Sequence, residues 1–153
     1  MDMYLLLKGS PNNVSWSLTD MKYKRSELLK GKPDKWMLWG IRERFKWILN
    51  DLPGSLVFLY VTKGEEISGG LALYGVAHEV IELKKKYWPQ GVWRRGFYLE
   101  LKGAVKGIIE NPENPTEWRL ILREKLRKLG IAILPGPQKI SEDKANILKE
   151  LFK

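Results

Sequence analysis

The stretch from residue 55 to residue 83 constrains the fold of this chain most. Residues 55–62 and 67–83 are rich in Val, Leu, Ile and Tyr, and only the polar segment at residues 63–66 separates them. This pattern predicts two antiparallel strands joined by a short turn. The second strand contains three glycines, which predict bulges or tight curvature: Gly69, Gly70 and Gly75. We therefore expect a sheet that bends strongly, as in a barrel.

Two further segments have the character of strands. Residues 3–7 form a short apolar run that ends in the turn formers of residues 8–13, so we expect a buried strand followed by a loop. Residues 97–105 alternate between apolar and polar side chains, as a half-buried strand does. Residues 20–35 are basic and weakly patterned, and there we expect an irregular excursion.

Three segments have features of amphipathic helices. In the first, apolar residues occur at positions 41, 45, 48, 49 and 52, so Arg42 and Arg44 are expected to face outward. The second has Thr116 as its cap and continues to residue 129. The third has Ser141 as its cap and contains the last apolar residues of the chain.

The order of these elements predicts the fold class. Short curved strands mixed with three helices at the edges indicate an α+β domain built on a small, strongly bent sheet, and they argue against regular βαβ alternation. The 153 residues suit one domain spanning residues 1–153. We expect a binding mouth at one end of the sheet.

The composition restricts the partners and the chemistry. Lys and Arg number 27 against 18 for Asp and Glu, and this net charge of +9 indicates a polyanionic partner. The chain has no cysteine, which excludes disulfides, thiolate metal sites and a cysteine nucleophile. Its apolar runs are too short to cross a bilayer and no secretory signal begins it, so we expect no membrane association and a cytoplasmic location.

Tryptophan is unusually frequent, with seven in the chain. Trp88 and Trp93 lie among basic residues between two expected strands, and Trp36 and Trp39 lie in a lysine-rich segment that we expect to be a loop. Aromatic faces can stack on a base taken out of a duplex, while Lys and Arg hold the neighbouring phosphates. The alternative is that these tryptophans are ordinary core or rim residues. A phosphate-facing role is expected for five basic residues: Lys84, Lys85, Lys86, Arg94 and Arg95.

Enzymatic activity has one candidate motif. Glu100 and Lys102 are two apart on an expected strand and point to one face, as a metal-dependent nuclease would require. Glu79 or Glu82 would have to supply a second carboxylate, and an exposed Glu/Lys alternation is commoner as a solvated strand face. A single histidine, His78, excludes a histidine-rich metal site, and no zinc-deaminase or phosphate-loop motif is present. We therefore expect a binding domain without a cofactor.

Several segments together resemble a known family. They are residues 3–10 with Asn13-Val14, residues 35–39 around Trp36, residues 56–61 and 67–72, Trp88 and Trp93 followed by Gly96-Phe97, and residues 139–141. In these segments the chain resembles the YTH domain, the reader of N6-methyladenine, and its wider relatives in the PUA and EVE group. The stretch from Trp88 to Phe97 is the most specific part, because it matches the second and third tryptophans of the family's aromatic cage.

The resemblance implies a fold and a site. The fold is a PUA/YTH-like, strongly bent open β-barrel of about six strands flanked by helices. The cage comprises Trp36, Trp88 and Trp93, with Trp39 as a substitute for Trp36. Hydrogen bonds to the edge of the adenine would come from three residues at the end of the first strand: Ser10, Asn13 and, near the base or the backbone, Lys8.

The function implied by the resemblance is that of a reader of N6-methyladenine in DNA. Domains of this kind occur at the N-terminus of McrB-type modification-dependent restriction proteins, where a separate GTPase and nuclease cut the DNA. A charge-rich, heat-adapted composition favours such a prokaryotic, archaeal or thermophilic setting. The alternative partner is methylated or otherwise modified RNA, since a flipped base offers nearly the same edges in both nucleic acids.

Overall fold

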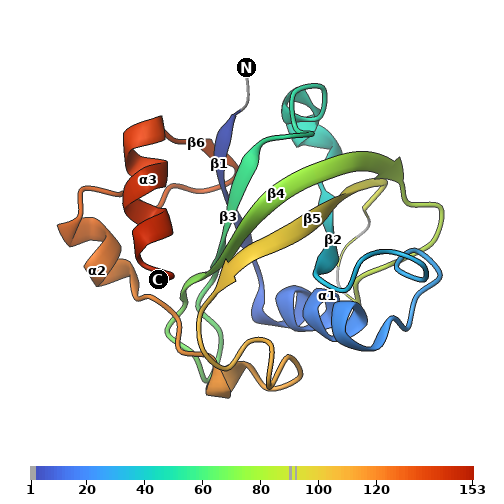
Figure 1. The fold of residues 1–153 in the computed structure, drawn as a ribbon, viewed down its shortest axis with the longest axis horizontal. Coiled ribbons are helices and arrows are strands. Elements are labelled where there is room, and N and C mark those ends of the chain that lie inside the picture. The colour runs from blue at the N-terminus through green and yellow to red at the C-terminus, as the bar shows by residue number, and fades with distance from the viewer. Residues whose placement is uncertain (1–2, 90, 92) are drawn as a thin grey trace.

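A bent sheet of six strands organises the computed structural model, which describes residues 3–89, 91 and 93–153. Its strands are β1 (Tyr4–Gly9), β2 (Trp36–Ile41), β3 (Leu56–Val61), β4 (Gly70–Glu82), β5 (Arg95–Ala104) and β6 (Gln138–Lys139). The helices are α1 (Pro11–Tyr23), α2 (Arg123–Lys128) and α3 (Glu142–Glu150), with the short 3-10 helices η1 (Glu43–Ile48) and η2 (Pro115–Glu117). Figure 1 shows the long strands β4 and β5 curving through the middle of the molecule.

The strand order is β2-β5-β4-β3-β1-β6. The pairs β3–β4, β4–β5, β2–β5 and β1–β6 are antiparallel, whereas β1 runs parallel to β3. The register between β4 and β5 shifts at Tyr74/Gly75 and again between Ala77 and Val80, and such bulges bend and twist a sheet. The predicted strand pair and the predicted irregularity at Gly75 are therefore confirmed. The sheet stays open at β2 and β6, which confirms the expected bent, open α+β architecture.

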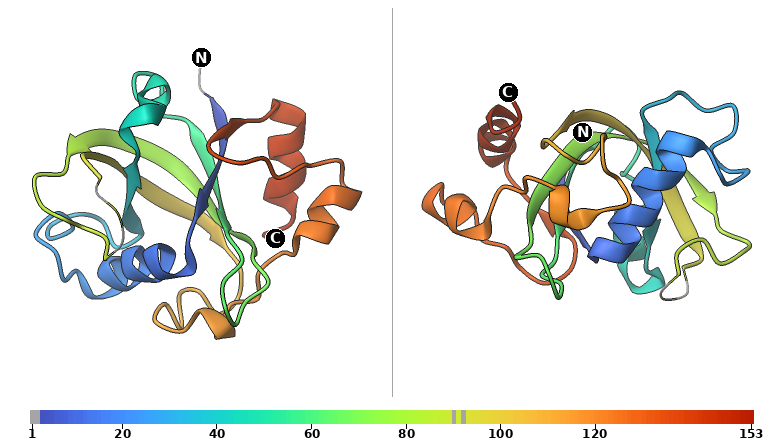
Figure 2. Two further views of the ribbon diagram at one scale, coloured as in Figure 1. Left: turned by 180° about the vertical axis from the view of Figure 1, so that it is seen from behind. Right: turned by 90° about the horizontal axis from the view of Figure 1, so that it is seen from below.

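Both faces of the sheet are covered by apolar layers. Successive residues of a strand point to opposite faces, so Leu5 and Leu7 of β1 join the core beneath α1, and Leu6 joins a second core. The second core includes Leu126 of α2 and Leu148 of α3. Figures 1 and 2 show the same division, with α2 and α3 on one side of the sheet and α1 on the other. Within the described residues, no helix is long and apolar enough to cross a membrane.

The loop predicted after the first strand is wrong, because α1 begins there. Ser10 caps α1, with its Oγ accepting a hydrogen bond from the Asn13 backbone N–H at 3.2 Å, and Pro11 occupies the first turn. Ser and Pro are favoured at helix starts as well as in turns. Val14 and Leu18 then bury the inner side of the helix. Residues 10–13 therefore start a helix.

The helix predicted over residues 41–52 is also wrong. Ile41 ends β2, and the following turns of η1 are interrupted at Phe45, whose φ of −104° and ψ of 20° are not helical. Ile48 and Leu52 are buried as expected, but from an irregular segment. The predicted loop around Trp36 and Trp39 is in fact the strand β2, which pairs with β5.

The two C-terminal helices match the sequence in part. Ser141 caps α3 as predicted, since its Oγ accepts a hydrogen bond from the Lys144 N–H at 3.2 Å. The helix expected from Thr116 to residue 129 is shorter, because Thr116 belongs to η2 and only Arg123–Lys128 form α2. Gly130 follows α2 with a φ of 82°, the left-handed conformation with which glycine commonly ends a helix.

Candidate functional site

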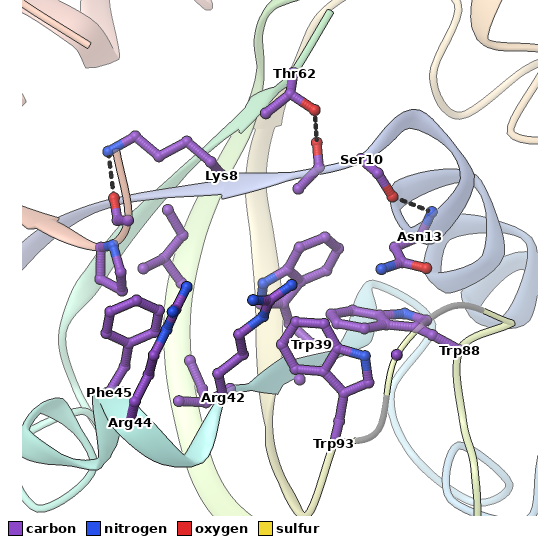
Figure 3. Close-up of a pocket in the computed structure, with 17 residues that line it drawn as sticks. Lys8, Ser10, Asn13, Trp39, Arg42, Arg44, Phe45, Thr62, Trp88 and Trp93 are labelled. Carbon is purple, nitrogen blue, oxygen red and sulfur yellow. Dashed lines mark hydrogen bonds between the residues drawn. The ribbon is translucent and has the colours of Figure 1, made fainter. Parts of the chain in front are cut away.

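A cavity of about 350 Å³ lies between the end of β1, the β2–η1 segment and the loop that joins β4 to β5. Figure 3 shows its lining, with α1 at one end and η1 at the other. Trp39, Trp88 and Trp93 form one wall, Arg42 lies beside Trp39 and Trp93, and Arg44 and Lys8 lie farther along the cavity. The polar residues at the α1 end and beside it are Ser10, Asn13 and Thr62. The cavity thus combines a wall of tryptophans with three cationic side chains.

Three tryptophans pack edge to face in this wall. The ring centroids of Trp39 and Trp88 are 4.4 Å apart at an interplanar angle of 66°, and those of Trp88 and Trp93 are 4.8 Å apart at 85°. Trp88 is 1% exposed and Trp39 is 4% exposed, whereas Trp93 is only partly buried. At these separations no flat ring fits between Trp88 and either of the other two indoles. Trp93 is the most accessible indole of the wall.

Glycines allow the three rings to sit this closely. A Cβ at Gly9 would overlap the Trp39 ring, and a Cβ at Gly40 would lie 2.9 Å from the Trp88 ring. At Gly91, with a φ of 80°, it would lie 2.7 Å from Trp93 Nε1. Each tryptophan of the wall therefore packs against a residue without a side chain.

Buried hydrogen bonds fix the wall to α1. Trp88 Nε1 donates to Ser17 Oγ at 2.8 Å, and Ser17 Oγ donates to the Leu38 carbonyl at 2.8 Å. The neighbouring Tyr87 hydroxyl donates to Asp20 Oδ2 at 2.6 Å. Burial, together with this carboxylate, raises the pKa of Tyr87 far above its ordinary value. The β4–β5 loop is thus anchored to α1 through the side chains of two consecutive residues, Tyr87 and Trp88.

Asn13 supplies the unusual polar group of the site. Its side chain is buried, and its Oδ1 has no hydrogen-bond partner among the residues that the structure describes. A buried, unpaired amide oxygen costs about 1 to 3 kcal/mol. Rotation of the amide exchanges its oxygen and nitrogen, so Asn13 can offer an acceptor or a donor to a molecule in the cavity. The Ser10 hydroxyl beside it accepts the α1 capping bond and keeps its own proton to donate.

Lys8 is held at the rim by neutral oxygens. Its Nζ donates to the Gly136 carbonyl and to Gln138 Oε1, both at 2.7 Å. Burial lowers the pKa of Lys8 from 10.5 to about 8. The C-terminal part of the chain therefore fixes the position of a cation that the first strand supplies.

Trp36 does not belong to this wall, which corrects the cage expected from Trp36, Trp88 and Trp93. Its ring stacks on His78, with centroids 4.1 Å apart and an angle of 16°, and lies near Tyr98. Residues three apart on a strand point to opposite faces, so Trp36 and Trp39 diverge. Trp39, the expected substitute, is the β2 residue that lines the cavity.

The five basic residues predicted to hold phosphates do not form one patch. Lys84, Arg94 and Arg95 surround a shallow depression together with Glu43 and Glu82. Lys85 is exposed, and Lys86 lies on the other side of the loop, beside Tyr87.

Two arginines that the sequence reasoning placed elsewhere line the cavity instead. The Arg42 guanidinium lies 5.1 Å from the centroid of the Trp93 ring, and that of Arg44 lies 4.8 Å from the Phe45 ring. The misassigned helix had directed both arginines outward. Recognising the apolar run of β2 as a strand would have placed them at its end, beside Trp39.

Glu100 and Lys102, the candidate nuclease residues, form an ion pair with each other. Glu100 Oε2 lies 3.1 Å from Lys102 Nζ and its Oε1 lies 2.9 Å from His78 Nε2, and both contacts lower the pKa of Glu100. Glu79 pairs with Lys32 at 3.2 Å. Across the part of the chain that the structure describes, no three His, Asp or Glu side chains group as metal ligands. Glu100 and Lys102 do share one face, as predicted, but no second carboxylate joins them.

Comparisons with known proteins rest on structure alone. No protein-family model and no curated protein sequence matches the chain. A hypothetical protein from Leishmania major is similar to it, with a TM-score of 0.57 and 14% identity over 99% of this chain and 94% of that one.

Two similar structures contain DNA. The N-terminal domain of Thermococcus gammatolerans McrB, bound to 5-methylcytosine DNA, has a TM-score of 0.52 and 15% identity over 99% of this chain and 100% of that one. Human THYN1, in complex with DNA containing 5-methylcytosine, has a TM-score of 0.52 and 15% identity over 99% and 98%. The chain therefore has the PUA/EVE-like fold of these two domains, as the sequence predicted.

Proposed function

We propose that this chain is a reader domain that binds a methylated base extruded from DNA. The observation that carries the proposal is the cavity of about 350 Å³ that three tryptophans and three cationic side chains line together. A base has flat aromatic faces and is attached to an anionic backbone, so it matches both kinds of side chain. The DNA bound by the McrB domain and by THYN1 supports the same proposal.

In this proposal the base packs against Trp93 and the parts of Trp39 and Trp88 that line the cavity. Extrusion of a base costs a few kcal/mol, and contact with aromatic rings offsets much of this cost. A methyl group buried against the indoles adds about 0.8 kcal/mol. The Asn13 amide and the Ser10 hydroxyl bond the polar edge of the base. Lys8, Arg42 and Arg44 face the phosphates.

Two methylated bases are the specific versions of this proposal. The sequence resemblance to the YTH domain favours N6-methyladenine, read with Trp39 in place of Trp36. The two similar DNA complexes favour 5-methylcytosine. Modified RNA is the alternative nucleic acid. In each version the domain does no chemistry itself, and a GTPase and a nuclease in other domains or subunits of a McrB-type system would act on the recognised DNA.

The test is a binding titration with duplexes that differ by one methyl group. Plain DNA is compared with duplexes containing N6-methyladenine or 5-methylcytosine, and RNA of the same sequence forms a separate arm. We expect tighter binding to one methylated duplex, and the preferred base decides between the two versions. Equal affinity for all the DNA duplexes contradicts the proposal, and a preference confined to RNA replaces DNA as the partner.

A pair of tryptophan variants locates the site. Trp93→Ala is expected to remove the preference for the methylated duplex, because it removes the most accessible indole of the wall. Trp36→Ala is the matched control: it deletes an indole that stacks on His78 outside the cavity and should keep the preference. Circular dichroism checks that both variants fold. If only Trp36→Ala loses the preference, Trp36 belongs to the binding site and the site proposed around Trp93 is wrong.

A further inference from the structure

A second cavity lies on the outer side of the loop that carries Trp88. Its volume is about 230 Å³, and it shares no lining residue with the first cavity. Its walls come from α1, from the turn that follows α1 and from the β4–β5 loop: Trp16, Thr19, Asp20, Arg25, Lys86 and Tyr87. It is therefore a separate site within the same surface region.

The two cavities are adjacent because the same two segments line both. Along the loop, Tyr87 faces the second cavity and the next residue, Trp88, faces the first. Along α1, Asn13 lines the first cavity and Trp16 lines the second, and three helical residues correspond to a rise of about 4.5 Å. Two sites on the same helix and on consecutive residues of the same loop are close enough for one DNA strand to reach both.

The chemistry of the second cavity also fits a nucleotide. Trp16 is 48% exposed, although it lies on a helix whose apolar residues otherwise mostly face the core. Arg25 and Lys86 add cations beside it. The carboxylate of Asp20 is buried and accepts hydrogen bonds from Tyr87, from the Ser26 hydroxyl and from the Ser26 N–H, so its oxygens are already engaged. What remains accessible is an indole face with two cationic neighbours.

Arg25 is available to an anion despite its ion pair. Its contact with Glu113 is long, at 3.8 Å, and both side chains are more than half exposed. Exposed pairs of this kind contribute little and are exchanged readily for a stronger partner. A phosphate can therefore displace Glu113, with Lys86 on the loop side of the cavity.

We propose that the second cavity is a subsite for a nucleotide of the bound DNA, close to the flipped base and on the same strand. Its base stacks on Trp16, and Arg25 and Lys86 hold its phosphate. This inference rests on the proposed reader function and adds a contact that does not touch the methyl group. Stacking on one aromatic side chain contributes affinity without base preference.

The first experiment measures binding of plain and methylated duplexes to Trp16→Ala. We expect the affinity for both duplexes to fall by the same factor, about 5- to 100-fold, with the preference for methylation unchanged. Trp16→Phe should restore most of the affinity. Leu122→Ala is the control, because Leu122 is equally exposed but lies at the start of α2, on the other side of the sheet. Unchanged binding by Trp16→Ala overturns the subsite.

The second experiment finds the nucleotide. A series of methylated duplexes carries one abasic residue at successive positions on either side of the flipped base. At the position that meets Trp16, the abasic residue should weaken DNA binding by the wild-type protein and leave DNA binding by Trp16→Ala unchanged. If the affinity loss from the abasic residue and the affinity loss from Trp16→Ala add in full at every position, the subsite does not exist. Failure of the reader function itself is separate, because there the wild-type protein would not distinguish methylated from plain DNA.

Discussion

At the scale of single residues, the shape of the cavity depends on glycines, which have no side chain. Gly9 lies under the Trp39 ring, where a Cβ would overlap the indole. Both residues are buried in the core, so the ring has little room to move aside. The glycine thus determines where an aromatic wall can stand.

We predict that Gly9→Ala destabilises the protein by about 1 to 3 kcal/mol and weakens the preference for methylated DNA, because the Trp39 ring must shift. Urea denaturation and the duplex titration measure the two effects. Gly31→Ala is the comparison, since a Cβ there meets no atom within 4 Å and adds only the strain of a φ of 80°. It should lose stability and keep the preference. An equal loss of preference in both variants would contradict this account of the wall.

Lys8 makes the stability depend on pH. Its pKa is about 8 in the folded protein, against 10.5 in the unfolded chain. Between these values the unfolded chain holds a proton that the folded protein has released, so the contribution of Lys8 rises with pH from about 8 to 10.5. Below pH 8 the cost of burying the charge is present in full. Urea denaturation at pH 7 and pH 10 should show the wild type gaining stability relative to Lys8→Met.

Binding should follow the opposite trend at the same residue. The Lys8 ammonium at the cavity rim loses its charge as the pH rises through about 8, so the affinity for DNA should fall between pH 7 and pH 9. Lys8→Arg keeps its charge throughout this range and should remove that part of the pH dependence. Titrations at fixed ionic strength measure both proteins. Parallel pH profiles would mean that Lys8 does not face the DNA.

At the scale of elements, the strands β1, β3, β4 and β5 were readable from the sequence, whereas β2, β6 and α1 were not. Val, Leu and Tyr in residues 55–62 and 67–83 identified β3 and β4, because those residues fit a pleated, buried surface. Ser10 and Pro11 suggested a turn, although the same residues start helices. The stripe of apolar residues over 41–52 suggested a helix, but an irregular segment buried them equally well. Periodicity alone does not separate these cases.

The same limit explains which part of the site was foreseen. Trp88 and Trp93, together with Ser10 and Asn13, were placed by resemblance and do line the cavity. Trp36 was chosen over Trp39 because of its resemblance to the first tryptophan of the family's cage, and the segment around both was expected to be a loop. A strand has a period of two, so its recognition would have shown that only one of these two tryptophans can face the cavity. Their role in binding a base remains a prediction.

The contact between α1 and the β4–β5 loop leads to a prediction at this scale. Tyr87→Phe removes the hydroxyl that donates to the buried Asp20 carboxylate, so we expect a loss of about 1 to 3 kcal/mol in the free energy of unfolding. Tyr23→Phe removes a hydroxyl from an exposed tyrosine and should change it by less than about 0.5 kcal/mol. Urea denaturation compares the two. A negligible effect of Tyr87→Phe would show that the loop is not anchored through this bond.

At the scale of the whole molecule, the net charge of +9 should appear as a salt dependence of DNA binding. Each phosphate that a Lys or Arg neutralises releases a counterion, so the logarithm of the affinity falls linearly with the logarithm of the salt concentration. Arg94→Ala should reduce this slope by about one and should lower the affinity for methylated and plain duplexes by the same factor. Lys144→Ala, on α3 across the sheet, should leave the slope unchanged. An unaltered slope in Arg94→Ala would exclude Arg94 from the phosphate contacts.

The pairing of β1 with both β3 and β6 has a consequence for how the protein is made. Lys8, near the start of the chain, obtains two of its hydrogen-bond partners from Gly136 and Gln138. A ribosome synthesises the chain from the N-terminus, so the first strand waits for its outer neighbour until residues 138 and 139 have been added. The rim around Lys8 is complete only after that event. A nascent polypeptide that still lacks residues 136–139 therefore cannot present the whole site.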